Sequence, residues 1–139
     1  EFHLTDALFC LVQDGVRMET FNVSLWFDCG KKDIILQTNK QLLKSKSADA
    51  YKQWQDKGNI IVPPVHISPS ALIENSIVGP DVSVGEDAHI SRSIVRNSII
   101  GLGASLNNAT IEDSLIGSDA SLSGAVHSLN IGDSAEINL

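Results

Sequence analysis

Asp28 stands in a setting that could support chemistry. It follows the stretch Met18 to Phe27, which is rich in β-forming residues and alternates polar with apolar side chains, so we expect a strand there. Gly30 comes just after, as in a turn. A carboxylate at the C-terminal end of a strand lies where α/β sheets bind their ligands. The alternative is that Asp28 only caps a helix that begins near Lys32.

Three histidines, His66, His89 and His127, raise the alternative of a zinc site, which needs three converging protein ligands. His89 stands between Ala88 and Ile90. If those two neighbours point into the core of a strand-built fold, His89 points outward. No spacing brings the three imidazoles together, so we expect solvated surface histidines.

The elements that must carry these residues include a long repeat from Ala71 to Ile137. In it, a small residue, or in two pairs Val or Leu, stands two places before a branched aliphatic one, which puts both on the same side of a strand. The pairs are Ala71/Ile73, Ser76/Val78, Val82/Val84, Ala88/Ile90, Ser93/Val95, Ser98/Ile100, Ala104/Leu106, Ala109/Ile111, Ser114/Ile116, Ala120/Leu122, Leu129/Ile131 and Ala135/Ile137. Successive pairs lie five or six residues apart except near residue 125, which predicts a parallel β-helix with one aliphatic column.

A longer period agrees with this prediction. The string aliphatic-Gly-x-x-Ala-x-aliphatic recurs with its glycines at 85, 101, 117 and 132, which are 16, 16 and 15 residues apart by subtraction. One turn then holds three strands and three corners, and we expect glycine at one corner because it adopts positive φ easily. These repeats resemble the hexapeptide-repeat family, which implies a left-handed β-helix of roughly four to five turns.

Composition limits the function classes. The chain has 139 residues, a formal net charge of −7 and only 5% aromatic residues. The negative charge argues against a nucleic-acid footprint, and no apolar run approaches the length of a membrane span. Cys10 and Cys29 lack metal-binding spacing; a disulfide is one option, and reduced, buried thiols in a cytoplasmic protein are the expectation.

Residues 1–58 read as a small α/β unit plus a linker, and residues 59–139 as the β-helix. We expect a helix from Leu4 to Gln13, with Thr5 or Asp6 as N-cap and Gly15 after its end. The predicted strand to Phe27 follows, and then a helix from Lys32 to about Leu43. Residues 50–55 are a further helical candidate.

Three motifs in this first part occur in a characteristic order: Glu1-Phe2-His3-Leu4-Thr5-Asp6-Ala7, then Trp26-Phe27-Asp28-Cys29-Gly30, then Thr38-Asn39 with Leu42-Leu43. They resemble the end of the catalytic domain of sugar-1-phosphate nucleotidyltransferases, in which E-x-x-L-T-D-A, W-x-D-x-G and T-N-x-x-L-L precede a hexapeptide β-helix. Glucose-1-phosphate thymidylyltransferase-like, mannose-1-phosphate guanylyltransferase-like and ADP-glucose pyrophosphorylase-like proteins share this layout.

The resemblance implies that Asp28 helps to hold Mg²⁺ against the phosphates of a nucleoside triphosphate in a parent enzyme that also binds a sugar 1-phosphate. For Trp26 the alternatives are packing and contact with substrate, and we expect packing. The family's Gly-rich loop with Arg and Lys is not in this sequence, so we expect an excised piece that has no catalytic residue or bound metal of its own. The alternative is a stand-alone hexapeptide-repeat transferase or a metal-dependent, carbonic-anhydrase-like protein.

Outward-facing strand residues suggest an interface. Taking every third strand as one face, Leu72, His89, Ser105, Ser121 and Glu136 form a mostly polar face. The other two faces carry outward aliphatics at Ile77, Ile94, Ile99 and Leu115. Contiguous apolar patches mark contacts, so we expect a homo-oligomer, a trimer or a dimer, built through these residues. The alternative is that the segment before the β-helix covers them.

Overall fold

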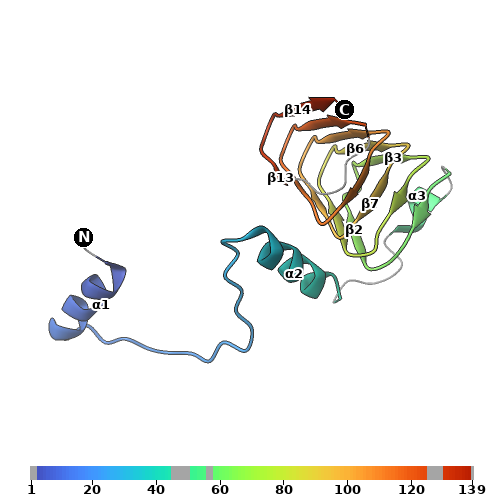
Figure 1. Ribbon diagram of the computed structural model, residues 1–139. Helices are drawn as coiled ribbons and strands as arrows, with labels where there is room; N and C mark the ends of the chain where they lie inside the picture. The colour runs from blue at the N-terminus through green and yellow to red at the C-terminus, as the bar shows by residue number, and fades with distance from the viewer. Residues whose placement is uncertain (1–2, 45–50, 56–57, 125–129, 139) are drawn as a thin grey trace.

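A parallel β-helix forms most of the chain, and helices precede it (Figure 1). The computed structural model describes residues 3–44, 51–55, 58–124 and 130–138. The helices are α1 (Leu4–Gln13), α2 (Lys32–Leu43) and α3 (Lys52–Gln55). The strands are β1 (Ile60–Ile61), β2 (Val65–Ile67), β3 (Leu72–Glu74), β4 (Ile77–Val78), β5 (Val82–Val84), β6 (His89–Ser91), β7 (Ile94–Arg96), β8 (Ile99–Ile100), β9 (Ser105–Asn107), β10 (Thr110–Glu112), β11 (Leu115–Ile116), β12 (Ser121–Ser123), β13 (Asn130–Ile131) and β14 (Glu136–Asn138).

Each strand from β1 to β9 pairs with the strand three places further along the chain, whereas β11 pairs with β13 and β12 with β14, and the strands form the three walls of a solenoid. Wall A contains β1, β4, β7 and β10; wall B contains β2, β5, β8, β11 and β13; wall C contains β3, β6, β9, β12 and β14. All pairs are parallel, and the register aligns Ile77 with Ile94 and Ile99 with Leu115. The predicted parallel β-helix and its three faces are therefore confirmed. The left-handed winding stays a prediction.

The predicted inward pairs form the core. Ile73, Val78, Ile90, Val95 and Leu106 have no measurable exposure, and Ala88 and Ala104 are also fully buried. Within the pairs that the structure describes completely, from Ala71/Ile73 to Ala120/Leu122, both members are buried. Leu129 lies outside the described residues, and the side chain of Ile137 does too.

Buried serines replace alanine where the backbone needs an extra partner. Ser93 Oγ donates to the carbonyl oxygen of Ser91 over 2.7 Å and accepts the N–H of Ala109 in the next turn over 3.1 Å. Ser98 does the same between Arg96 and Ser114. Each hydroxyl thus bridges two turns at a corner and leaves no buried polar atom unpaired.

The reason we gave for the repeated glycines is wrong. Gly85, Gly101 and Gly117 do not have positive φ. They stack on one another at the corner between walls B and C, where a Cβ on Gly101 would lie 2.6 Å from the carbonyl carbon of Gly117. Glycine is required there because successive turns approach too closely for a side chain. The positive φ occurs two residues later, for example at Asp87 with 53°.

The segment before the solenoid matches the prediction in its helices but not in its strand. α1 and α2 have the predicted bounds, and Gly15 follows α1 with a φ of 78°. The N-cap of α1 is His3, not Thr5 or Asp6; the Asp6 carboxylate accepts the His3 N–H over 3.0 Å. Residues 18–27 form no strand, because no neighbouring segment among the described residues offers them a backbone to pair with.

Trp54 closes the N-terminal end of the solenoid. This side chain, on α3, is only 4% exposed and belongs to the core cluster of the walls. Its Nε1 donates to the carbonyl oxygen of Ala71 over 3.1 Å, and its own carbonyl oxygen accepts from Asn59 Nδ2 over 2.8 Å. A large ring fits here because it covers the first turn rather than filling the narrow interior.

Candidate functional site

Asp28 lies in an exposed turn just before α2. Its Oδ1 accepts the N–H of Gly30 over 3.2 Å, so the carboxylate stabilises the turn itself. The N-cap of α2 is Lys31, which makes no side-chain capping bond, so Asp28 does not cap this helix. The expected position at the end of a strand is wrong, because the strand is not formed.

As a metal ligand, Asp28 can supply one carboxylate. Magnesium bound to phosphates uses one or two carboxylates and completes its shell with phosphate oxygens and water. A hard oxygen donor at Asp28 fits that chemistry. The described residues contain no group of three or more His, Cys, Asp or Glu side chains that could hold a metal by themselves.

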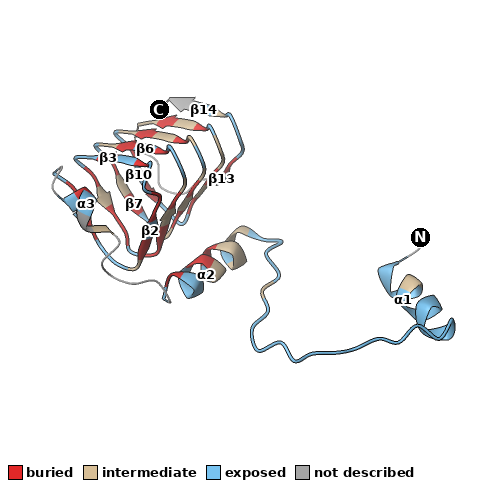
Figure 2. Ribbon diagram, turned by 180° about the vertical axis from the view of Figure 1, so that it is seen from behind, coloured by how far each residue is buried: buried red, intermediate tan, exposed pale blue. Residues whose placement is uncertain are grey.

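The segment that carries Asp28 exposes large apolar side chains. Trp26 is 81% exposed and Phe21 85%, and no residue of α1 is buried (Figure 2). Trp26 is therefore not packed within the described residues, and a packing role in a larger parent protein stays a prediction. Cys10 and Cys29 are free thiols and exposed, which corrects the expectation that they are buried.

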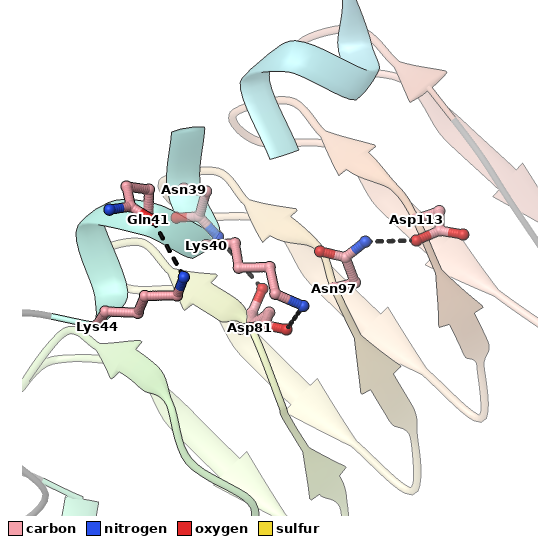
Figure 3. Close-up of polar contacts among 7 residues, drawn as sticks. All are labelled: Asn39, Lys40, Gln41, Lys44, Asp81, Asn97 and Asp113. Atoms are coloured by element: carbon pink, nitrogen blue, oxygen red, sulfur yellow. Dashed lines mark hydrogen bonds and ion pairs between the residues drawn. The ribbon is translucent and has the colours of Figure 1, made fainter. Parts of the chain in front are cut away.

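In contrast, α2 is packed against the solenoid (Figure 3). Its Leu36 and Leu43 are buried, and Asn39 between them is 9% exposed. Asn39 Nδ2 donates to the carbonyl oxygen of Asp81 over 3.2 Å, and its Oδ1 accepts from Ser83 Oγ over 2.5 Å. Lys40 Nζ pairs with the Asp81 carboxylate at 2.7 Å.

The contact lies at the corner where the chain passes from wall A to wall B, which we call the AB corner. Asp81, Asn97 and Asp113 occupy this corner in successive turns, all with positive φ, and Asn97 Nδ2 donates to Asp113 Oδ1 over 2.5 Å. Asparagine and aspartate tolerate this left-handed backbone better than most residues do. The same backbone requirement thus places polar side chains in a row beside α2.

Two clefts flank α2 at this corner. One, of about 450 Å³, is lined by Lys40, Val62, Ile77, Gly79, Pro80, Asp81, Arg96, Asn97, Glu112 and Asp113. The other, of about 410 Å³, is lined by Lys32, Asp33, Leu36, Gln37, Lys40, Asn97 and Asp113. Both carry side chains of each charge sign, so neither selects an anion or a cation.

The four predicted interface residues lie where expected. Ile77 and Ile94 are outward neighbours on wall A, and Ile99 and Leu115 on wall B, so they flank the AB corner. All four are half-buried, since side chains stack along each wall and α2 lies beside the corner. The interface at this edge, and the alternative that the preceding segment covers it, both stay predictions.

The histidines do not share a wall. His89 is exposed and points outward on wall C, as predicted, whereas His66 is exposed on wall B. His127 lies outside the described residues. Sequence reasoning placed these side chains but missed the roles of Asn39 and Asp81, because contacts between a helix and a distant corner have no local signal.

A comparison with models of known protein families finds no match, and a comparison with curated proteins also finds none. The fold itself defines the class, a parallel β-solenoid with a helix docked at one corner. No helix among the described residues is both long and apolar enough to cross a membrane.

Proposed function

We propose that this chain is the C-terminal part of a sugar-1-phosphate nucleotidyltransferase. The observation that carries the proposal is the combination of three motifs, E-x-x-L-T-D-A, W-x-D-x-G and T-N-x-x-L-L, with the parallel β-helix that follows them. The exposed Phe21 and Trp26 give independent support, because a segment with this apolar surface is suited to pack within a larger domain.

In this proposal Asp28 positions the reacting phosphates. When bound, Mg²⁺ would stabilise the charge that develops as a sugar-1-phosphate oxygen attacks the α-phosphorus of a nucleoside triphosphate and pyrophosphate leaves. Asp28 would hold the ion with one carboxylate oxygen while its Oδ1 stays fixed by the N–H of Gly30. Rigid placement of the carboxylate matters because misplaced ligands lose much of their effect.

The β-helix would serve assembly or regulation rather than chemistry. Ile77, Ile94, Ile99 and Leu115 border the AB corner and offer an apolar edge to a second copy. Burying one such side chain fully contributes about 1.5–3 kcal/mol, and a symmetric interface uses each patch more than once. The free energy gained by burying several such side chains is comparable to the roughly 4–15 kcal/mol that association costs in lost translational and rotational freedom.

The test compares the purified chain with the full product of the gene that encodes it. Each is incubated with Mg²⁺, a panel of nucleoside triphosphates and sugar 1-phosphates, and pyrophosphate release is followed by a coupled assay. We expect turnover only in the full product, because this chain contains no Gly-rich loop with Arg and Lys to hold a triphosphate.

A variant comparison assigns the role of Asp28. In the full product, Asp28→Asn should lower kcat/KM roughly 10²- to 10³-fold, since several kcal/mol of charge stabilisation depend on the metal ligand. Asp14→Asn removes an exposed carboxylate elsewhere in the segment and should leave kcat/KM unchanged. Turnover by the chain alone, or equal activity of the two variants, would contradict the proposal.

A further inference from the structure

The turns of the solenoid have similar backbone conformations. A docked helix can therefore recognise one particular turn only by the outward side chains in which that turn differs from the others. Along wall B the outward residues in register are His66, Ser83, Ile99, Leu115 and Asn130. Of these, Ser83 alone carries a hydroxyl, and it donates to Asn39 Oδ1 over 2.5 Å. The single hydroxyl of the row therefore lies beneath the buried amide of α2.

The AB corner shows the same distinction. Asp81, Asn97 and Asp113 hold the same corner position in successive turns. Lys40 pairs with the Asp81 carboxylate, and the side chain of Asp81 is only 9% exposed. One turn on, the residue in that position is a neutral amide, and Asn97 already donates to Asp113.

The apolar contacts of α2 cannot make this choice. Leu36 and Leu43 are buried, and because apolar burial has no direction, these side chains do not by themselves select one turn over the next. If α2 slipped by one turn, about 4.8 Å along the solenoid, the Asn39 amide would face Ile99 and Lys40 would face Asn97. A buried amide that faces an aliphatic side chain loses its partner without regaining water.

We propose that the turn formed by Asp81 and Ser83 is the docking surface for α2, and that Asn39 and Lys40 are positioning residues that fix α2 to this one turn. The T-N-x-x-L-L stretch is then a docking motif that sets where the preceding segment sits on the solenoid. This inference rests on the contacts of α2 alone and stands whether or not the proposed activity is found.

Hydrogen exchange with mass spectrometry on the whole chain tests the proposal, because it reports α2 and the successive turns of the solenoid separately. Ser83→Ile makes wall B more uniform and removes the hydroxyl that donates to Asn39 Oδ1, while the bond from Asn39 Nδ2 to the carbonyl oxygen of Asp81 stays available. We expect the α2 peptides to exchange about ten- to a hundredfold faster, while peptides from the later turns of the solenoid keep their rates. Asp81→Asn should accelerate α2 roughly two- to fivefold, since Lys40 is half-exposed.

Ser105→Ile is the matched control, because Ser105 is an equally half-buried outward residue on wall C, away from α2. It should leave exchange of α2 unchanged. The double variant Asn39→Leu with Ser83→Ile pairs two apolar side chains and should recover part of the lost protection, as replacing both partners of a buried hydrogen bond can be nearly neutral.

Three outcomes would overturn the proposal. One is unchanged α2 exchange in Ser83→Ile, and another is equal acceleration by Ser83→Ile and Ser105→Ile. The third is faster exchange throughout the walls in Ser83→Ile, which would make Ser83 a general stabiliser of the solenoid instead. Selective acceleration of α2 by Ser83→Ile supports the proposal, and partial recovery in the double variant supports the direct contact with Asn39.

Discussion

The stacked glycines at the corner between walls B and C allow a sharp test of why they are glycines. Replacing Gly101 by Ala would place a Cβ 2.6 Å from the carbonyl carbon of Gly117 and 2.7 Å from the backbone nitrogen of Ser118. Carbon atoms in good contact are about 3.5–4.0 Å apart, so the turns must separate by nearly 1 Å. Because the obstacles are backbone atoms, no side-chain rotation relieves the overlap.

Overpacking of this kind costs about 1–3 kcal/mol or more. For a cooperative unit of 60–100 residues, each kcal/mol lowers Tm by about 4–8 °C. Gly101→Ala should therefore lower the Tm of the solenoid by about 5–20 °C, measured by far-UV circular dichroism, with a matching fall in the urea midpoint. Gly132→Ala is the internal control, because a Cβ there meets nothing within 4 Å.

The Gly132→Ala control distinguishes two physical reasons for glycine at position 101, namely its backbone conformation and the close approach of the next turn. Gly132 is the fourth glycine of the same repeat and has no positive φ, so alanine should be neutral or stabilise by about 0.4–1 kcal/mol by restricting the unfolded chain. If glycine were needed for its backbone conformation, both variants would lose stability alike. Equal losses, or a Gly101→Ala protein as stable as the wild type, would refute the close-approach explanation.

Three further predictions follow from burial and position. Ile100→Asp places an unpaired carboxylate in the aliphatic column, where Ile100 is 1% exposed. Circular dichroism should show that the solenoid no longer folds. Wild-type stability of this variant would mean that the inward and outward positions of the strand are assigned wrongly. Trp54→Phe keeps a ring but leaves the carbonyl oxygen of Ala71 without its hydrogen-bond donor. Urea unfolding should therefore show a free energy of unfolding that is lower by about 1–3 kcal/mol. An unchanged free energy of unfolding would mean that Trp54 does not cap the solenoid. Light scattering should find an oligomer at tens of micromolar. The double variant Ile94→Lys with Leu115→Lys should give a folded monomer, because both side chains point outward. If the double variant unfolds instead, these two residues belong to the core.

The solenoid could be predicted in detail because one short pattern specifies it several times. A small residue two places before an aliphatic one fixes which side of each strand is inward, and the spacing fixes the corner. Pairs such as Ala104/Leu106 were thus assigned correctly to the core. The helices at Leu4–Gln13 and Lys32–Leu43 were also predicted, because caps and helical periodicity are local signals.

The prediction of a strand at residues 18–27 was wrong for a physical reason. A β-forming segment supplies either the donor or the acceptor of each hydrogen bond in a sheet. The other group must come from the backbone of a neighbouring strand. Asp28 consequently lies in a turn that it stabilises itself rather than at the edge of a sheet. The assignment of Asp28 to Mg²⁺ stays a prediction, because it depends on the resemblance and not on the geometry.

The sequence by itself determined the repeat, the core and the outward faces, because these depend on residues a few positions apart. Only the tertiary structure decided that α2 docks at Asp81 and Ser83, some forty residues further along the chain, and that Trp54 closes the end. It also decided why Gly101 is glycine, since the atoms that exclude a Cβ belong to the next turn. Contacts between distant residues depend on the completed surface, which no local pattern describes.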